Sequence, residues 1–320
     1  MTRNVRKLVR QLLIAATLTA GASASHAAEF INVLTGGTSG VYYPLGVSLS
    51  QIYGKALPTA KTSVQATKAS AENLNLLEAG RGEVAFTLGD SLNEAWKGNE
   101  EAGFKKPLKK LRTIAAIYPN YIQIVAAADS GIKTLADLKG KRISVGAPKS
   151  GTELNARDIF RGAGMTYKDF GKVEYLPFGE SVELMKNRQL DATLISAGLG
   201  VAAIRDLATS VKIVIVPIPP ETVAKIGEAA YLPGTIPAKT YENQNDAVPS
   251  VAVQNFLVTH EGVSADTVYT MTKAMFDNLD QLHAAHAAAK AIKKEDAAKG
   301  SPVPLHPGAE KYYREVGLLK

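Results

Sequence analysis

Apolar residues follow two recurring patterns along the chain: short continuous runs, and longer segments with an apolar residue every three or four positions. The runs predict strands and the longer segments predict helices. Predicted strands lie at 30–35, 59–67, 83–90, 111–118, 121–128, 141–146, 173–179, 191–198, 212–217 and 250–259. Predicted helices lie at 41–53, 70–80, 134–140, 150–162, 180–189 and 264–294, with a further start at 91 and a closing helix near 314. This alternation predicts an α/β fold.

The first predicted strand runs directly into a glycine-rich turn, residues 36–40, and then into a helix. Glycine permits backbone angles that side chains block, while Thr38 and Ser39 are able to cap the helix. The free N–H groups at a helix start favour a bound anion. The turn lacks the ending of a Walker loop, and Thr35 stands where the dinucleotide fingerprint needs glycine. We expect a small carboxylate here, with a purely structural turn as the alternative.

A second turn repeats this chemistry, because Ser150-Gly151-Thr152 follows the strand at 141–146 and opens another helix. Ser150 and Glu153 have the spacing of a capping box. In α/β sheets, ligands sit beyond the carboxyl ends of the strands, where such turns gather. The other candidates at this edge are Gly36, Gly37, Tyr42, Asp90, Tyr118 and Ser196. The two tyrosines have an alternative as core residues, and Asp90 has one as a helix cap.

Residues 1–28 combine a basic start, a short apolar run and Ser25-x-Ala27, which predicts a signal peptide that is too short to remain as a membrane span. Without them the 37 basic residues fall to 33 against 30 acidic ones, so the formal charge falls from +7 to +3. The sequence has no basic stripe interleaved with aromatic residues, so it gives no indication of nucleic-acid binding. The chain has no cysteine, which excludes thiol catalysis, and a mature length near 290 residues favours two domains.

Motifs for catalysis and for metal binding are missing from the sequence. It contains no Gly-x-Ser-x-Gly elbow and no His-Glu-x-x-His, and Ser130-x-x-Lys133 stands without its companion motifs. His283 and His286 are three apart, whereas the zinc-protease arrangement needs four and a glutamate between. We therefore expect neither an enzyme nor a cofactor or metal site, although catalytic triads assemble from distant residues.

Three segments together resemble the TAXI family, the extracytoplasmic solute receptors of TRAP transporters. They are residues 35–46 (Thr-Gly-Gly-Thr-Ser-Gly-Val-Tyr-Tyr-Pro-Leu-Gly), residues 134–146 with the turn at 150–152, and residues 302–308 (Pro-Val-Pro-Leu-His-Pro-Gly). The first is quite specific, whereas the Leu-x-Gly-Lys part of the second is shared by many two-lobed binding proteins. The likeness extends over essentially all of the mature chain.

This resemblance implies a type II periplasmic-binding-protein fold, with two α/β lobes joined by crossover strands and closing over a ligand cleft. Contacts to the ligand would fall on Gly37, Thr38, Ser39 and Tyr42, with Ser150, Gly151 and Thr152 opposite. The better-known TRAP receptor family clamps the carboxylate with an arginine, and no arginine here can be assigned that role. Family members are associated with glutamate, related amino acids and dicarboxylates. For a ligand ammonium group, Asp90 or Asp191 is the candidate partner.

We therefore expect a signal peptide at 1–28, one lobe at 29–120 plus 261–320, and a second lobe at 121–260. The expected protein is a monomeric periplasmic receptor without catalysis, which binds a small carboxylate and delivers it to a sodium-coupled TRAP permease. Three alternatives stay open: the receptor of an ATP-driven transporter, an exported hydrolase that uses Ser150 or Ser39, and a sensor or adhesin subunit that binds a protein.

Overall fold

The structure is a computed structural model and describes residues 29–320, so the predicted signal peptide lies outside the described residues. Within this range, the strands form one mixed sheet in the order β2-β1-β3-β10-β4-β7-β5-β6, with β8 beside β4 and β9 beside β10. Their bounds are β1 (Phe30–Leu34), β2 (Lys61–Gln65), β3 (Val84–Leu88), β4 (Leu111–Ala127), β5 (Arg142–Ser144), β6 (Lys172–Glu174), β7 (Ala192–Ala197), β8 (Ile213–Val216), β9 (Tyr231–Ile236) and β10 (Val248–His260).

The helices cover this sheet on both faces, as the alternating pattern predicts. They are α2 (Tyr42–Ala56), α3 (Ser70–Glu78), α4 (Gly89–Lys97), α5 (Gly151–Gly162), α6 (Phe178–Lys186), α7 (Ala202–Ser210), α8 (Pro220–Ile226), α9 (Ala265–Asp277), α10 (Leu279–Ala285) and α11 (Pro307–Glu315). None of the helices within 29–320 has both the length and the apolar character required to cross a membrane.

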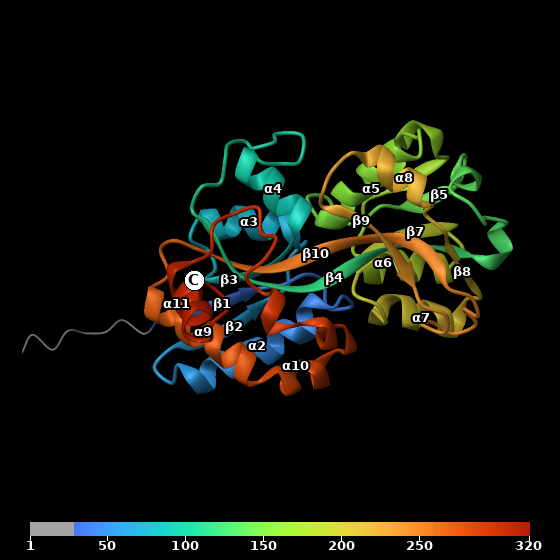
Figure 1. Cartoon of the computed structure of the whole chain (residues 1–320). Coiled ribbons are helices and arrows are strands. Elements are labelled where there is room, and N and C mark those ends of the chain that lie inside the picture. The colour runs from blue at the N-terminus through green and yellow to red at the C-terminus, as the bar shows by residue number, and fades with distance from the viewer. Residues whose placement is uncertain (1–28) are drawn as a thin grey trace, which may run out of the picture.

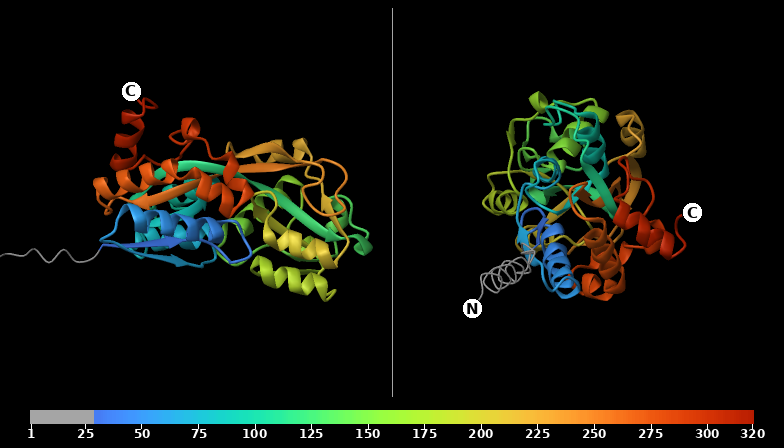
Figure 2. Two further views of the ribbon diagram at one scale, coloured as in Figure 1. Left: turned by 90° about the horizontal axis from the view of Figure 1, so that it is seen from below. Right: turned by 90° about the vertical axis from the view of Figure 1, so that its left-hand side faces the viewer.

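Two groups of elements lie at opposite ends of the long strands β4 and β10 (Figure 1). We call β1–β3 with α2–α4 and α9–α11 the first half, and β5–β9 with α5–α8 the second half. Figure 2 shows the elongated molecule that results. The predicted α/β fold with two lobes joined by crossover strands is confirmed. The lobe limits near 120 and 260 stay a prediction.

The strands at 121–128 and 250–259, predicted to cross between lobes, are indeed partners, since β10 pairs with β4 antiparallel over most of its length. The predicted break at Pro119 is wrong, because β4 continues through it and Pro119 lies opposite Gln254. The register shifts between Gln254 and Phe256. Proline has no N–H to donate to a ladder and is tolerated at such irregularities, so the strand passes through.

Some predicted helix limits are also wrong. The segment at 264–294 is interrupted after α9 at Asn278, which has extended rather than helical φ, and α10 follows. The segment at 134–140 is a single 3₁₀ turn. The proline-punctuated region after 217 is typical of edge and connecting segments. It contains the strand β9 beside β10, and also α8, which the sequence does not predict.

Several predicted caps also differ from the structure. Ser39 and Thr38 do not cap α2, and Ser70 lies inside α3, where its Oγ accepts from the Leu88 N–H at 3.1 Å. Ser91 and Glu94 have the spacing of a capping box, but no such box forms, because α4 already begins at Gly89. The cap of α5 is confirmed: Ser150 Oγ accepts from the Glu153 N–H at 3.1 Å. His306 is buried and caps α11 by accepting from the Gly308 N–H.

Candidate functional site

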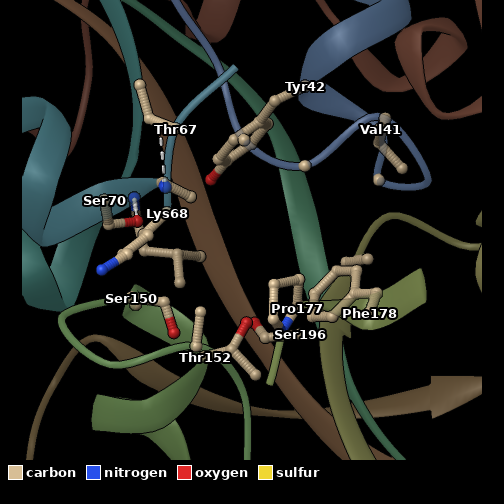
Figure 3. A pocket seen from close by; sticks show the side chains of 18 of the residues that line it. Val41, Tyr42, Thr67, Lys68, Ser70, Ser150, Thr152, Pro177, Phe178 and Ser196 are labelled. Atoms are coloured by element: carbon tan, nitrogen blue, oxygen red, sulfur yellow. Dashed lines mark hydrogen bonds between the residues drawn. The ribbon is translucent and has the colours of Figure 1, made fainter. Parts of the chain in front are cut away.

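A cavity lies between the two halves, beside the crossover strands (Figure 3). About 130 Å³ of it is open to the centres of water-sized molecules, well above the roughly 10–15 Å³ that one water needs. The halves touch on either side of it: the Ala203 N–H donates to the Ser39 carbonyl at 3.2 Å, and Gly151 packs on Ser70. A molecule of a few carbon atoms therefore has room between the halves.

Four helices begin at this cavity, two from each half. Val41 precedes α2, Ala69 precedes α3, Gly151 starts α5 and Pro177 precedes α6, and all four residues line the cavity. Each helix has nine residues or more. A helix start carries a partial positive charge and N–H groups without intrahelical partners. The convergence of four such ends favours a negatively charged guest.

Lys68 is the charged side chain that lines the cavity; among the described residues, no acidic side chain does so. It is exposed, and within 29–320 its ammonium group makes no ion pair. Its own N–H donates to the carboxylate of Glu72 on α3 at 2.6 Å. Sequence reasoning missed Lys68, although its position between a strand end and a helix start was the available signal. A cation at this place adds to the positive field of the helix ends.

Ser196 Oγ is a polar atom that the fold leaves free. The residue ends β7, is 5 % exposed and lines the cavity, yet its hydroxyl has no hydrogen-bond partner within the described chain. A buried hydroxyl without a partner costs roughly 1–3 kcal/mol. A ligand oxygen in the cavity would remove that cost.

Backbone strain occurs beside the cavity in both halves. Ala69 has φ 68° and ψ −151°, a region that glycine adopts and L side chains rarely do. Its N–H is held by Thr67 Oγ1 at 2.9 Å, as the dashed line in Figure 3 marks. In the second half, Lys149 has φ 61° directly before the cap of α5. Residues in such sparsely populated conformations cluster at binding and active sites, so both positions agree with a ligand site here.

A chain of buried amides links the cavity walls of the two halves. The Tyr42 hydroxyl donates to Asn255 Oδ1 on β10, and Asn255 Nδ2 donates to Asn120 Oδ1 on β4 at 2.7 Å. Asn120 Nδ2 in turn donates to the Ser196 carbonyl on β7 at 3.0 Å. Burial raises the pKa of Tyr42, so this hydroxyl stays protonated and keeps its donor role. The side-chain orientation on each wall is therefore tied to the crossover strands.

The structure brings seven of the predicted residues to the cavity, and whether they bind a ligand stays a prediction. They are Gly36, Gly37, Tyr42, Ser150, Gly151, Thr152 and Ser196. Thr38 and Ser39 are not among the lining residues, contrary to expectation. Thr38 is exposed, and the backbone of Ser39 bonds the second half instead.

Asp90 and Tyr118 are buried behind the cavity wall and do not line it. Asp90 follows β3 as expected, but its Oδ2 accepts a hydrogen bond from Asn155 and lies 2.9 Å from the Tyr231 hydroxyl oxygen, both in the second half. Tyr118 is fully buried on β4. This agrees with the alternative interpretation, in which Tyr118 is a core residue.

Asp191 is not at the cavity, which corrects its proposed role as partner of an ammonium group. It precedes β7, at the opposite strand end from Ser196. Arg142 donates to its carboxylate at 3.0 and 2.6 Å, and these bonds hold the pKa of Asp191 below its usual value. The side chain stabilises the outer edge of the second half.

The likeness to known proteins agrees with this geometry. The NMT1-like family matches residues 33–317. The alkanesulfonate-binding protein SsuA from Xanthomonas axonopodis pv. citri, bound to MOPS, is 15% identical with a TM-score of 0.51, and the match covers 91% of this chain and 92% of that one. A putative L-cystine ABC transporter from Listeria monocytogenes is also 15% identical with a TM-score of 0.51, covering 84% and 98%. A structure described as a periplasmic transporter is 11% identical with a TM-score of 0.53, covering 91% and 94%. At identities of 11–15%, these likenesses show a shared fold and nothing further.

Proposed function

Since the chain belongs to the NMT1-like family, which covers residues 33–317, we propose that it is a solute-binding receptor that captures a small carboxylate between its two halves. In this proposal residues 1–28 direct export to the periplasm, and the loaded receptor delivers its ligand to a membrane permease. The receptor binds and releases without chemical change.

The observation that carries this proposal is the charge of the cavity. Four helix starts and Lys68 converge on it, and no acidic side chain within 29–320 lines it. A hydrogen bond to a charged partner contributes roughly 1.5–3 kcal/mol, against about 1 for a neutral one. Several N–H groups with one ammonium group therefore replace the arginine clamp that the sequence lacks.

The lining favours a dicarboxylate over an acidic amino acid. An amino acid would bring an ammonium group, and the two candidate partners are engaged elsewhere, Asp90 behind the wall and Asp191 at the outer edge. The apolar side chains of Val41, Leu88 and Phe178 suit a short carbon chain. A desolvated ammonium without an acceptor would lose more than the added contacts gain.

The transporter partner we propose is a sodium-coupled TRAP permease, on the strength of the TAXI-like segments at 35–46 and 302–308. The receptor of an ATP-driven transporter shares the fold and is the alternative. A neighbouring gene for a fused permease supports the first, and genes for an ATPase subunit support the second. A serine hydrolase gains no support, because Ser150 Oγ serves as the cap of α5 and no histidine within the described chain lines the cavity.

Calorimetry on the mature chain tests the ligand class. We expect succinate to bind with one molecule per chain, glutamate to bind at least tenfold more weakly, and the uncharged succinamide not to bind. Binding of succinamide as tight as that of succinate would contradict the charge argument. Conversion of any panel member to a product would contradict a receptor.

A pair of threonine variants tests the position of the site. Thr152 lines the cavity and Thr38 does not, and both lie in predicted ligand turns. A neutral hydrogen bond contributes about 0.5–1.5 kcal/mol, so Thr152→Ala should weaken succinate binding by roughly two- to tenfold. Thr38→Ala should leave it unchanged. The reverse order would place the ligand outside this cavity.

A further inference from the structure

A cluster of polar side chains joins the two halves behind the cavity wall. Asp90 comes from α4 in the first half, Asn155 and Asp158 come from α5, and Tyr231 comes from β9. Asn155 Nδ2 lies 2.7 Å from Asp90 Oδ2 and 3.0 Å from the Tyr231 hydroxyl oxygen. Asp90, Asn155 and Tyr231 are each less than 5 % exposed. Asp158 lies at the edge of the cluster and is partly exposed, so water reaches its side chain but not the contacts among the other three.

The hydrogen atoms in this cluster do not suffice when both carboxyl groups are ionised. The Tyr231 hydroxyl oxygen lies 2.9 Å from Asp90 Oδ2 and 2.7 Å from Asp158 Oδ2. A hydroxyl has one hydrogen, so it donates to only one of these two oxygens. The other contact would set two oxygen acceptors face to face. One added proton removes the conflict: a protonated Asp90 donates to Tyr231, and Tyr231 donates to Asp158.

We propose that the receptor holds one proton between its halves, on the Asp90–Tyr231–Asp158 chain, and that it takes up this proton when the halves come together. Separation of the halves removes Asn155, Asp158 and Tyr231 from Asp90 and returns its carboxyl to water, where it ionises. The proton is thus a second ligand of the arrangement that encloses the cavity. Its link to anion capture rests on the proposed function.

The surrounding charges agree with a proton at this place. Burial is the main reason that the pKa of Asp90 rises from 3.8 to about 7; the Ser91 N–H and Tyr231 oppose the rise, while Asp158 and Glu228 add to it. Burial also raises the pKa of Asp158, against Arg161, whose guanidinium bonds it at 2.6 Å. Glu94 on α4 and Tyr42 on α2 complete the titratable surroundings. Within 29–320, the groups that act on the pKa of Asp90 include no cation.

The sign of the pH dependence follows from this. The pKa of Asp90 is higher with the halves together than apart, so the gain is fully present below about 3.8 and is lost as pH rises toward about 7. One proton changes the closing equilibrium by at most tenfold per pH unit in that window. Above about pH 7, protonation of Asp90 no longer changes the closing equilibrium.

A locked chain tests the proton site without any ligand. The chain has no cysteine, and a Cβ at Gly179 would lie 3.5 Å from Ser39 Oγ across the halves, so cysteines at these two positions would be direct neighbours. We expect the oxidised Ser39→Cys/Gly179→Cys chain, labelled with ¹³C-aspartate, to show a carboxyl resonance that titrates near pH 7. That resonance should vanish with Asp90→Asn and persist with Asp246→Asn, an exposed aspartate in the same chain. Reduction of the disulfide should lower its midpoint.

A locked chain in which every aspartate titrates below about pH 5 would overturn the proton site. Circular dichroism of each variant shows whether it is folded. Should Asp90→Asn not fold, Asp158→Asn replaces it, and the resonance must then shift, since the two carboxyls share the proton through Tyr231.

The pH dependence of affinity tests the link to capture. We expect succinate binding by the wild-type chain to weaken more steeply between pH 5 and 7 than binding by Asp90→Asn, by up to tenfold per pH unit. The comparison cancels the titration of succinate itself. Equal slopes would overturn the link. Absence of any anion binding would defeat the proposed function alone, because the locked-chain titration needs no ligand.

Discussion

At the scale of single residues, Lys68 is an example of a cavity residue that the sequence alone does not reveal. Gly37, Gly151 and Thr152 were found because glycine and hydroxyl residues at a helix start form a local pattern. Lys68 looks like an ordinary surface lysine until β2 and α3 bring it beside the second half. Asn120 and Asn255, 135 positions apart, meet only through strand pairing. Such side chains carry no local signal.

Lys68→Met should weaken succinate binding by roughly ten- to a hundredfold. The reason is the loss of a charge-assisted bond that contributes roughly 1.5–3 kcal/mol. Calorimetry measures this, and the slope of affinity against salt should fall as well. Lys106→Met, which removes an exposed lysine from the same half outside the lining, is the matched control. Equal affinities of the two variants would remove Lys68 from the site.

Gly151→Ala should weaken binding while the chain stays folded. A Cβ at this position would lie 2.5 Å from Ser70 Oγ and 2.7 Å from Leu88 Cδ1, both in the first half. Ser70 and Leu88 are both buried and have little room to turn aside, so we expect the halves to move apart and the cavity to open. Gly179→Ala is the control, because its Cβ would meet Ser39 Oγ at an ordinary 3.5 Å. Calorimetry should show a loss only in the first variant; an unchanged affinity would mean that the halves do not close on the ligand.

At the scale of elements, apolar periodicity located most strands and helices, because each buries one face or both against its neighbours. It missed α7, α8 and β9. Apolar periodicity also gave wrong limits where the end or continuation of an element depends on contacts with residues far away in the sequence. Pro119 passes through a long strand because β10 shifts its register opposite, and the long predicted helix ends at Asn278. Neither event changes the spacing of apolar residues along the chain.

Removing the cap of α5 should affect both stability and ligand binding, whereas removing the cap of α9 should affect stability alone. Ser150 Oγ and Ser264 Oγ each accept an N–H bond at 3.1 Å, at α5 and α9. Replacing either by alanine should lower the free energy of unfolding by about 1 kcal/mol in urea titrations. Ser150→Ala should also weaken succinate binding, since α5 begins at the cavity, whereas Ser264→Ala should not. Weaker binding in both variants would point to a general loss of order.

At the scale of the whole molecule, the halves share a sheet and a core. One apolar cluster contains Leu45 and Tyr118 together with Ile195 and Leu207 of the second half. Composition and length predicted two domains but not this continuity, because it depends on how strands from both ends of the chain pair. The halves are thus parts of one folding unit.

Urea unfolding should therefore follow one transition. Trp96, the single tryptophan, reports on the first half by fluorescence, and far-ultraviolet circular dichroism reports on both halves. The two curves should coincide within error, as expected for a cooperative unit. A tryptophan transition clearly separated from the dichroism transition would show that the halves unfold independently.

The missing ladder bond at Pro119 has a mechanical consequence. The register of β4 against β10 shifts between Gln254 and Phe256 and again between Leu257 and Val258, so the ladder is irregular over one short stretch of the crossover. An irregular ladder bends more easily than a regular one. If the proposed receptor closes on its ligand, we expect the halves to turn about this stretch, while the regular parts of the crossover strands keep their pairing.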